Sequence, residues 1–397
     1  MEATTAMLLL TLTTMATPTS DNVTETYIYD NVSTTSGKSP SSVNPRSSGY
    51  SSYYVSPTLD LVLYIATIII AVVGCLANAY VLLALLLSKN SRASNINIFI
   101  THQTILDLTS CAFLFMSLVL ETVDYAETDS SLALFVCWFF GAHAITTTAG
   151  NASVGGLMII TIERYVKIVH SVAYRNHYRP WMTRCGVIFP WIFGICTGFI
   201  PIVATSKVVR GRCNLGSYYI NDWIAEIWNI AKFILLYLGP LFVFIFGYWK
   251  ILMVIRRQKK LVGLSQLQGT SSGAVTAQQK RSRRTEMNII RTVILVSVSF
   301  ALCFVCIRTY SILTGFRVTP AIGSLYLLFS VFSYSNSCLN PFIYATQYEI
   351  VRSWWKVIIC RLVRRQHVEE VSMAQPVAPD RNERMQSNKI HVTTKNL

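Results

Sequence analysis

The chain has 397 residues, of which 52% are hydrophobic and only 13% are charged. Because a soluble globular domain carries about 25% charged residues, this composition excludes an ordinary soluble protein and points to a lipid environment. The net charge of +15 would suggest nucleic acid as a partner if the basic residues formed one patch, but most of the 34 Lys and Arg fall in four separated segments.

The N-terminal segment, residues 1–57, is rich in Ser, Thr, Tyr and Pro and shows no apolar periodicity. We therefore expect a disordered leader. Within it, sequons for N-glycosylation begin at Asn22 and Asn31. The apolar stretch 7–15 resembles the core of a weak signal peptide, but no basic residue precedes it, so cleavage is not expected.

After this leader the chain alternates between apolar and basic segments. A helix that crosses a bilayer needs roughly 20 apolar residues with few or no charges. Stretches of about this kind occupy residues 59–87, 96–120, 133–162, 183–204, 224–255, 290–314 and 322–345. The sequence therefore predicts an all-α membrane protein built as a bundle of seven transmembrane helices.

The basic segments occur in alternate connections between these stretches, which fixes the orientation. They are residues 89–92, 164–184, 256–284 and 352–365. Since cytoplasmic connections carry the excess of Lys and Arg, these segments should be cytoplasmic. The leader then lies outside the cell and the tail inside, as in a multi-pass protein of the plasma membrane.

The predicted organisation is a transmembrane domain at 58–346, a short amphipathic eighth helix at 347–365, and a disordered cytoplasmic tail at 366–397. The eighth helix is expected to lie on the inner leaflet because apolar residues recur at helical spacing among basic ones. Cys360 at its end is a candidate for palmitoylation, and an unmodified interfacial cysteine is the alternative.

Polar motifs recur near the ends and in the middle of the predicted helices. The third ends in Glu163-Arg164-Tyr165, the second contains Asp107, and the seventh contains Asn340-Pro341-Phe342-Ile343-Tyr344. Further matching positions are Gly74, Asn78, Trp191, Pro201, Pro240 and Tyr248. Together these residues resemble the rhodopsin-like (class A) G protein-coupled receptors, over roughly residues 58–360. The resemblance implies a non-enzymatic receptor whose partners are an extracellular ligand, a heterotrimeric G protein and arrestin.

Arg164 is a permanently charged side chain at the cytoplasmic mouth and needs a partner. Glu163 is adjacent to it, and the resemblance places Glu286, at the start of the sixth helix, beside it as well. The ion pairs of Arg164 with Glu163 and Glu286 would hold the third and sixth helices together in the resting state. When they break, the sixth helix would swing outward, and Tyr248 and Tyr344 would fill the space that it leaves.

Asp107 is a carboxylate inside the membrane, so it must be paired, hydrated or neutral. The resemblance implies an allosteric sodium ion, held by Asp107 together with Ser153, Asn336, Ser337 and Asn340. Oxygen-bearing side chains suit such a hard cation. The alternative is a hydrated hydrogen-bond network around a protonated Asp107.

The resemblance also implies a disulfide between Cys137 and Cys213, at the outer end of the third helix and in the second extracellular loop. The spacing from Cys137 to Arg164 is longer than usual for the family. We therefore expect an irregular register in the outer part of the third helix.

The sixth helix departs from the family pattern. Family members carry Cys-Trp-x-Pro there, whereas this chain has Cys303-Phe304-Val305-Cys306, preceded by Phe300. Phe300 and Phe304 are the predicted switch residues. Without Pro at position 306 no backbone hydrogen bond is forced open, so this helix should be straighter than usual.

The residues at the expected ligand-binding positions exclude some classes of ligand and favour others. Thr146 stands where amine receptors carry an acidic residue, and the seventh helix has no Lys for retinal, so neither a monoamine receptor nor an opsin is expected. Lys232 and Arg308 lie in the outer half of their helices and could bind an acidic group. Alternatively, Lys232 reaches the interface and Arg308 pairs with Glu226 or Glu121.

The leading hypothesis is therefore a receptor for a peptide or an acidic small molecule. One alternative is a receptor-fold protein with weak or no G protein coupling that acts through heteromers, motivated by the missing Trp and Pro. A less favoured alternative is a transporter or channel, which would predict duplicated halves with broken helices.

Overall fold

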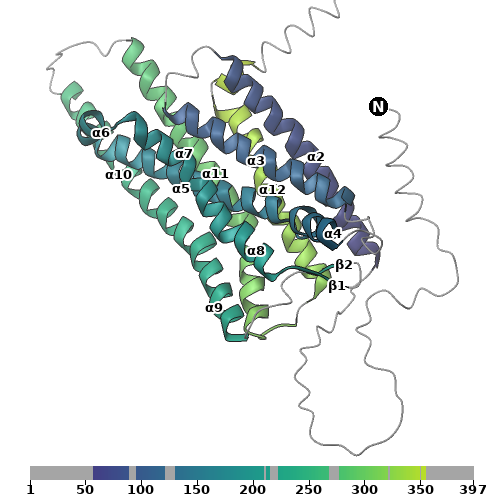
Figure 1. Ribbon diagram of the computed structural model, residues 1–397. Coiled ribbons are helices and arrows are strands. Elements are labelled where there is room, and N and C mark those ends of the chain that lie inside the picture. Colours follow the sequence, from purple (N-terminus) through teal and green to yellow (C-terminus); the bar gives the residue numbers. More distant parts are fainter. Residues whose placement is uncertain are drawn as a thin grey trace, which may run out of the picture. The chain divides into compact units, whose positions relative to one another are not determined.

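The computed structural model describes residues 57–88, 95–120, 130–209, 212–214, 222–267, 277–320, 322–348 and 350–354 (Figure 1). All of them belong to one compact unit of the chain, Tyr50–Leu397. The predicted glycosylation at Asn22 and Asn31, the palmitoylation at Cys360 and most of the predicted eighth helix lie outside the described residues. Of that helix, residues 350–354 are described, and they are helical.

Long helices account for every predicted span. They are α2 (Pro57–Leu87), α3 (Asn95–Leu120), α5 (Ala144–Val169), α7 (Pro180–Gly194), α9 (Asp222–Phe233), α10 (Gly239–Leu267), α11 (Ala277–Gly315) and α12 (Gly323–Gln347). Shorter helices are α4 (Ser130–Val136), α6 (Ser171–His177) and α8 (Ile200–Thr205). In the described part of the chain, 6 helical stretches are long and apolar enough to cross a membrane by themselves. The seventh, α12, contains no charged residue but many Ser, Asn and Tyr.

The first helix of the bundle illustrates why these segments suit a bilayer. Along α2, many large apolar side chains are exposed, and four of them, Val62, Ile69, Leu76 and Leu83, recur at intervals of seven residues. The opposite face buries small or polar residues, including Thr67, Gly74 and Asn78. Apolar residues therefore meet lipid while polar ones meet neighbouring helices, as expected where water is absent.

The third predicted span is not one continuous helix. It consists of α4, a π-helical segment at Cys137–Gly141 and, after a turn at residues 142–143, α5. His143 ends the turn in a left-handed conformation with φ 51. This break accommodates the extra residues between Cys137 and Arg164, so the expected irregular register is a wide turn followed by a new helix start.

Two other spans are interrupted just before a proline. A π-helical segment at Ile234–Leu238 precedes Pro240, and another at Ile195–Phe199 precedes Pro201. Proline donates no hydrogen bond, and its ring collides with the carbonyl four residues earlier, so a wider turn relieves the contact. In contrast, α11 runs from Ala277 to Gly315 as one α-helix. This continuity agrees with the lack of proline at position 306.

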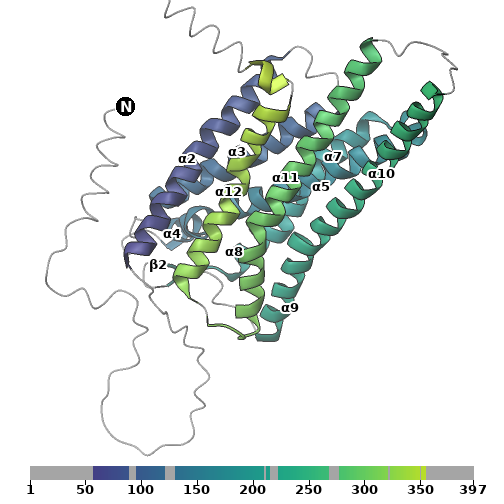
Figure 2. The same ribbon diagram turned by 180° about the vertical axis from the view of Figure 1, so that it is seen from behind.

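The helix α5 lies at the centre of the bundle, where it packs against α3, α7 and α10. Figure 2 shows α12 between α2 and α11, and its packing contacts agree. Glycines permit the closest approach in the α5–α7 contact. A Cβ on Gly194 would collide with the carbonyl oxygen of Thr148 and lie 2.8 Å from the Cβ of Ala152.

The strands β1 (Lys207–Val209) and β2 (Arg212–Asn214) form a short antiparallel hairpin after α8. The structure forms the predicted disulfide between Cys213 on β2 and Cys137, with their Cα atoms 5.2 Å apart. The hairpin is thereby tied to the segment that precedes α5. Figure 1 shows the hairpin and α4 at one end of the bundle, with α6 and the free ends of α10 and α11 at the other.

Candidate functional site

The buried ion pair at the inner end of α5 joins adjacent residues. Arg164 donates from Nε to Glu163 Oε2 at 2.5 Å and from Nη2 to Oε1 at 2.8 Å. Both side chains are almost fully buried. Two parallel charge-assisted hydrogen bonds of this kind fix the guanidinium in one orientation.

A tyrosine from the helix that follows α5 completes this pair. Tyr174 on α6 donates its hydroxyl hydrogen to Glu163 Oε1 at 2.8 Å and accepts a hydrogen bond from Asn95 at the start of α3, at 3.2 Å. Burial raises the pKa of Tyr174, and the neighbouring Glu163 charge raises it further, against the opposite effect of Asn95. The tyrosine therefore remains a neutral donor. Sequence reasoning missed Tyr174, because only the tertiary structure brings α6 back onto Glu163.

The predicted pairing between Arg164 and Glu286 is not present. Glu286 on α11 is exposed, and its charge acts on Lys167, one turn beyond Arg164. The physical reason is that Glu163 already neutralises Arg164 through two of its donors, while the exposed carboxylate of Glu286 remains solvated. The hydrogen bonds around Arg164 in this conformation thus link α5 to α6 and α3, and not to α11.

The three predicted switch tyrosines occupy different environments. Tyr248 on α10 is buried, and its hydroxyl lies 2.7 Å from that of Thr161 on α5 and 3.2 Å from that of Ser297 on α11. Tyr344 on α12 is fully enclosed in the core. Tyr165 lies farther out, with its ring against His170 and Phe246. Tyr248 is therefore the residue that connects the three helices α5, α10 and α11.

Asp107 is the centre of a second buried network, midway along α3. Its Oδ1 accepts from Ser153 at 2.7 Å, and its Oδ2 accepts from Asn340 Nδ2 at 2.8 Å. Ser337 also contributes a hydrogen bond to this carboxylate. The structure therefore brings together residues from α3, α5 and α12 that the sequence placed in one ligand set.

Gln103 joins this network and was not predicted. Its Nε2 donates to Ser153 Oγ at 2.5 Å and approaches Asp107 Oδ2 at 3.4 Å. It is fully buried, and Gly156 on α5 makes room for it, since a Cβ there would collide with Gln103 Oε1. A glutamine one turn before the aspartate, on the same face of the predicted helix, was the signal available in the sequence.

The donor chemistry of this network fits a hard cation. The amide oxygens of Gln103, Asn336 and Asn340 are buried and have no hydrogen-bond partner within the described part of the chain. Gln103 and Asn340 also contact Asp107, so this network holds acceptor oxygens without a donor. Such oxygens suit sodium, and water could also supply the missing donors.

Pro341 and Asn78 explain how α12 is held against α2. Proline 341 leaves the carbonyl of Ser337, four residues earlier, without its helical donor. Asn78 Nδ2 donates to that carbonyl at 2.9 Å and to the carbonyl of Gly74 at 2.9 Å. The amide thus replaces the hydrogen bond that the proline removes, and joins the two helices where the Asp107 network lies.

In the opposite half of the bundle, a cation begins a stack of aromatic rings. The guanidinium carbon of Arg308 lies 5.5 Å from the ring centroid of Phe304. The Phe304 and Phe300 centroids are 5.0 Å apart, and Phe300 meets Phe244 edge-on at 5.6 Å. Phe300 is fully buried. The stack therefore leads from a charged group on α11 to the aromatic core between α10 and α11.

Lys232 on α9 lies close enough to Arg308 for the two positive charges to interact. Among the described residues, no carboxylate lies within ion-pair distance of either one. This excludes Glu226 as the partner of Arg308, and Glu121 lies outside the described residues. Arg308 Nε is buried without an acceptor in the described part of the chain. Two adjacent cations without a counter-ion among the described residues form a candidate anion site.

Thr146, the other predicted ligand contact, is almost fully buried on α5. The hydroxyl of Ser110 on α3 lies 3.4 Å from its carbonyl oxygen. Its own hydroxyl has no partner among the described residues. The role of Thr146 in ligand binding remains a prediction.

Comparison with known proteins identifies the family. A family model described as 7 transmembrane receptor (rhodopsin family) matches residues 77–344. Galanin receptor type 1 of Rattus norvegicus is 27% identical over 302 residues, which cover 74% of this chain and 81% of the relative. Somatostatin receptor type 5 of Rattus norvegicus is 24% identical over 327 residues, which cover 81% and 83%. Galanin receptor type 1 of Homo sapiens is 26% identical over 311 residues, which cover 76% and 83%.

These matches and the fold confirm the resemblance read from the motifs and decide against a transporter or channel. The chain belongs to the rhodopsin family of seven-transmembrane receptors, which are G protein-coupled receptors and not enzymes.

Proposed function

We propose that this receptor binds an extracellular peptide through an acidic group that Lys232 and Arg308 hold. Relatives named for galanin and somatostatin are peptide receptors, which favours a peptide over an acidic small molecule. Binding would then drive G protein coupling at Arg164, on the opposite side of the membrane.

The observation that carries this proposal is the cation pair at the head of the aromatic stack. Two like charges held together raise each other's energy, and an anionic ligand group would relieve that repulsion. Arg308 rests on Phe304, and Phe304 contacts Phe300. A ligand that pulls on Arg308 would therefore displace rings packed between α10 and α11, the helices whose separation opens the inner face.

The proposed orientation places the leader outside the cell and the basic segments at the plasma membrane's inner face. It is supported by the Cys137–Cys213 disulfide, since disulfides form in oxidising compartments, and by the positive-inside pattern. The same orientation would allow glycosylation at Asn22 and Asn31 outside the cell. Inside, it would allow palmitoylation of Cys360, lipid binding by the adjoining segment and arrestin recruitment by the tail.

We further propose that the Asp107 network holds a sodium ion, with Ser153, Asn336, Ser337 and Asn340 as its other ligands. A bound cation would neutralise the buried carboxylate. The chain's own residues would then set the packing of α3, α5 and α12 around it, because Ser153 and Asn340 each bond Asp107 from a different helix.

The first experiment measures G protein activation in cells exposed to a panel of peptides and organic acids. For an activating peptide, we expect Arg308→Gln and Lys232→Gln to reduce potency by about ten- to one-hundred-fold, because each removes a charge-assisted hydrogen bond. Arg164→Ala should abolish coupling while the peptide still binds. Arg317→Gln, the same charge change outside the cation pair, is the matched control and should leave potency unaltered.

Unchanged potency in both cation variants, at equal surface expression, would show that the ligand binds elsewhere. The unmodified chain could instead fail to activate a G protein with any peptide or acid, and Arg164→Ala could leave G protein activation unchanged. A receptor-fold protein that acts through heteromers would then be the better description.

A further inference from the structure

Two free cysteines lie on the same turn of α11. Cys303 and Cys306 are three positions apart, and between them stands Phe304, the ring over which the Arg308 guanidinium lies. The other free cysteines within the described ranges are isolated along the chain: Cys75, Cys111, Cys185, Cys196 and Cys338. The sixth span therefore carries a dithiol next to a ring of the aromatic stack.

The helical spacing brings the two thiols close to each other. Side chains three positions apart are neighbours on a helix, with Cβ atoms about 5–6 Å apart. A disulfide requires Cα atoms about 4.4–6.8 Å apart and Cβ atoms about 3.5–4.5 Å apart. Three residues of an α-helix span about 5 Å between Cα atoms, which meets the first condition. The Cβ atoms must approach by about 1 Å, so a disulfide forms only if this turn shortens on the side of the thiols.

The two thiols differ in how exposed they are. Cys303 is only 7% exposed and packs in the core, whereas Cys306 is partly exposed. Hydrogen peroxide is small and uncharged, so it can reach a thiol inside a membrane. It would transfer one oxygen to the sulfur of Cys306, giving a sulfenic acid and one water. The thiol of Cys303 would then attack that sulfur, form the S–S bond and release the oxygen as a second water.

Both thiols lie on the side of α11 that meets α12. Residues seven positions apart share a helix face, and Tyr310 follows Cys303 by seven. The ring of Tyr310 packs edge-on against Phe329 of α12, with centroids 5.4 Å apart. The Tyr310 hydroxyl also accepts from the backbone N–H of Ile322 and donates to its carbonyl, which holds the outer half of α11 against the start of α12. A shortening of this side would therefore bend the inner half of α11 toward α12.

We propose that Cys303 and Cys306 form a modification site, a dithiol that a peroxide oxidises to a disulfide, which bends α11 where the chain lacks the family's proline. The inner half of α11 meets α10 on another side, where the hydroxyls of Ser297 and Tyr248 lie 3.2 Å apart. A bend toward α12 would thus move the inner half of α11 away from α10. Because separation of these two helices opens the inner face, the oxidised receptor would favour the active arrangement.

The size of this movement follows from helix geometry. A shortening of about 1 Å on one side of a helix backbone about 5 Å across bends it by about 10°. From Phe304 to Arg284 the helix extends over about 20 residues, or about 30 Å. A bend of about 10° at Phe304 therefore displaces the inner end of α11 by about 5 Å.

The first measurement locates the bridge in the full-length receptor, purified in mild detergent and treated with hydrogen peroxide. Free thiols are alkylated, and the protein is digested with trypsin without reduction. Trypsin releases both thiols in one peptide, because they lie between Arg291 and Arg308. We expect this peptide to lose two hydrogens and to take up no alkylating reagent, whereas in Cys306→Ala the thiol of Cys303 should be alkylated. Cys196→Ala removes an exposed free cysteine and is the matched control, which should leave the bridge intact.

The second measurement is the distance between the inner ends of α10 and α11. Spin labels on unnatural side chains, introduced at the exposed positions Arg256 and Arg284, report this distance without using a thiol. Oxidation should lengthen it by about 5 Å in the unmodified chain and leave it unaltered in Cys306→Ala. If Cys306→Ala does not fold, Cys303→Ala removes the same bridge.

A tryptic peptide whose thiols are both alkylated after peroxide, or carry added oxygen without a bridge, overturns the modification site. Bridges from Cys303 or Cys306 to a different cysteine also overturn it. A bridge that leaves the spin-label distance unchanged, or shortens it, overturns the bend away from α10. Both measurements are made without peptide or G protein, so their failure is distinguishable from a failure of the function proposed for Lys232 and Arg308.

Discussion

Gln103 places a neutral amide beside a buried carboxylate that the family resemblance assigns to a sodium ion. Its Nε2 donates to Ser153 and approaches Asp107, so it supplies two of the donors that a cation would otherwise replace. Ser153 must then share its oxygen between the amide and any ion. At the scale of single residues, Gln103 should therefore influence how tightly the network would hold a sodium ion.

We predict that Gln103→Leu strengthens the effect of sodium. Removing a hydrogen bond to a charged group costs about 1.5–3 kcal/mol, and a sodium ion can recover that loss by coordinating the freed oxygens. The measurement is the thermal unfolding midpoint of the purified receptor in sodium chloride against choline chloride. An ion that binds only the folded state raises the midpoint.

We expect sodium to raise the unfolding midpoint more for Gln103→Leu than for the unmodified chain. For Asp107→Asn we expect no change in the midpoint. The asparagine variant is a suitable control because it keeps the shape of the side chain and removes its charge. If Gln103→Leu and the unmodified chain responded equally to sodium, Gln103 would have no influence on the ion.

At the scale of elements, the helices of the bundle differ in whether a π-helical segment interrupts them. The outer part of the third span, α7–α8 and α9–α10 each contain a π-helical segment, whereas α11 contains none over its described length. The α5–α7 contact depends instead on small residues, because Gly194 and Gly198 both lie directly against Thr148. Helices in membranes associate through such close packing.

We predict that Gly194→Ala destabilises the receptor by about 1–3 kcal/mol, the usual cost of overpacking a well-filled contact. The added methyl group would collide with backbone atoms of α5, which cannot move aside as a side chain can. Apparent unfolding midpoints at one scan rate are the measurement, since membrane proteins often unfold irreversibly.

Gly150→Ala is the matched control for this substitution. Its new Cβ would lie 3.8 Å from Ser110 Oγ, which is an ordinary contact. Both changes replace a helical glycine by alanine, so the gain in helix propensity is common to them. A midpoint for Gly194→Ala equal to that for Gly150→Ala would show that α7 can shift away from α5 at little cost.

At the scale of the whole molecule, signalling depends on how much the resting arrangement is favoured over the active one. In this conformation the inner end is held by Arg164, Glu163, Tyr174 and Asn95, which join α5, α6 and α3. Glu286 on α11 is not part of it. In this conformation Arg164 is thus held at a different inter-helix contact from the one that the sequence suggested.

We predict that Tyr174→Phe raises signalling without ligand by several-fold, because Glu163 loses a hydrogen bond worth about 1.5–3 kcal/mol and releases Arg164 more easily. Tyr178→Phe is the matched control, since Tyr178 bonds to Thr183 and not to Glu163. Glu286→Ala should change basal activity less than Tyr174→Phe does. Basal G protein activation at equal surface expression is the readout, and a basal level for Tyr174→Phe equal to that of the control would refute the network's role.

The sequence by itself determined the seven spans and the family, and it predicted an orientation for them. These follow from local properties, because a bilayer demands about 20 apolar residues per helix and satisfied backbone groups, and both are visible along the chain. The disulfide partners Cys137 and Cys213 were also identified from motif positions, as were Ser153, Ser337 and Asn340 of the Asp107 network, but Gln103 was not. The break at His143 was foreseen only as an irregular spacing.

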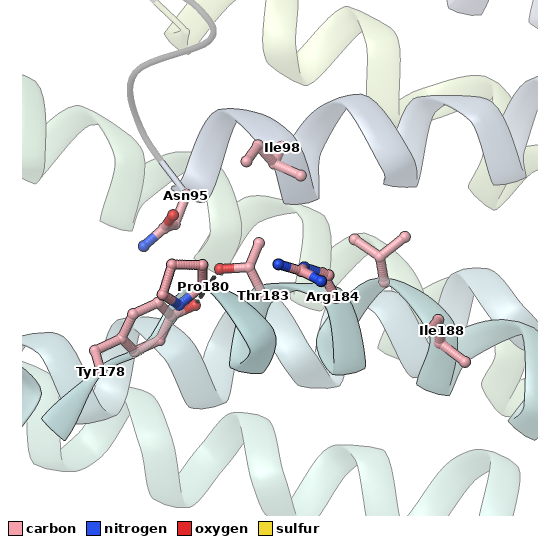
Figure 3. A pocket seen from close by; sticks show the side chains of 8 residues that line it. Asn95, Ile98, Tyr178, Pro180, Thr183, Arg184 and Ile188 are labelled. Atoms are coloured by element: carbon pink, nitrogen blue, oxygen red, sulfur yellow. Dashed lines mark hydrogen bonds between the residues drawn. The ribbon is translucent and has the colours of Figure 1, made fainter.

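The tertiary structure alone decided which side chains meet. Gln103 reaches Ser153, and Tyr174 reaches Glu163, because of how each helix is rotated and how α6 folds back, neither of which a linear pattern records. The same holds for the stack of Arg308 on Phe304 and for the groove where α3 and α7 begin, which Asn95 and Arg184 help to line (Figure 3). Membership of a bundle is a property of each segment's own composition, whereas contacts between helices depend on packing that only the assembled bundle fixes.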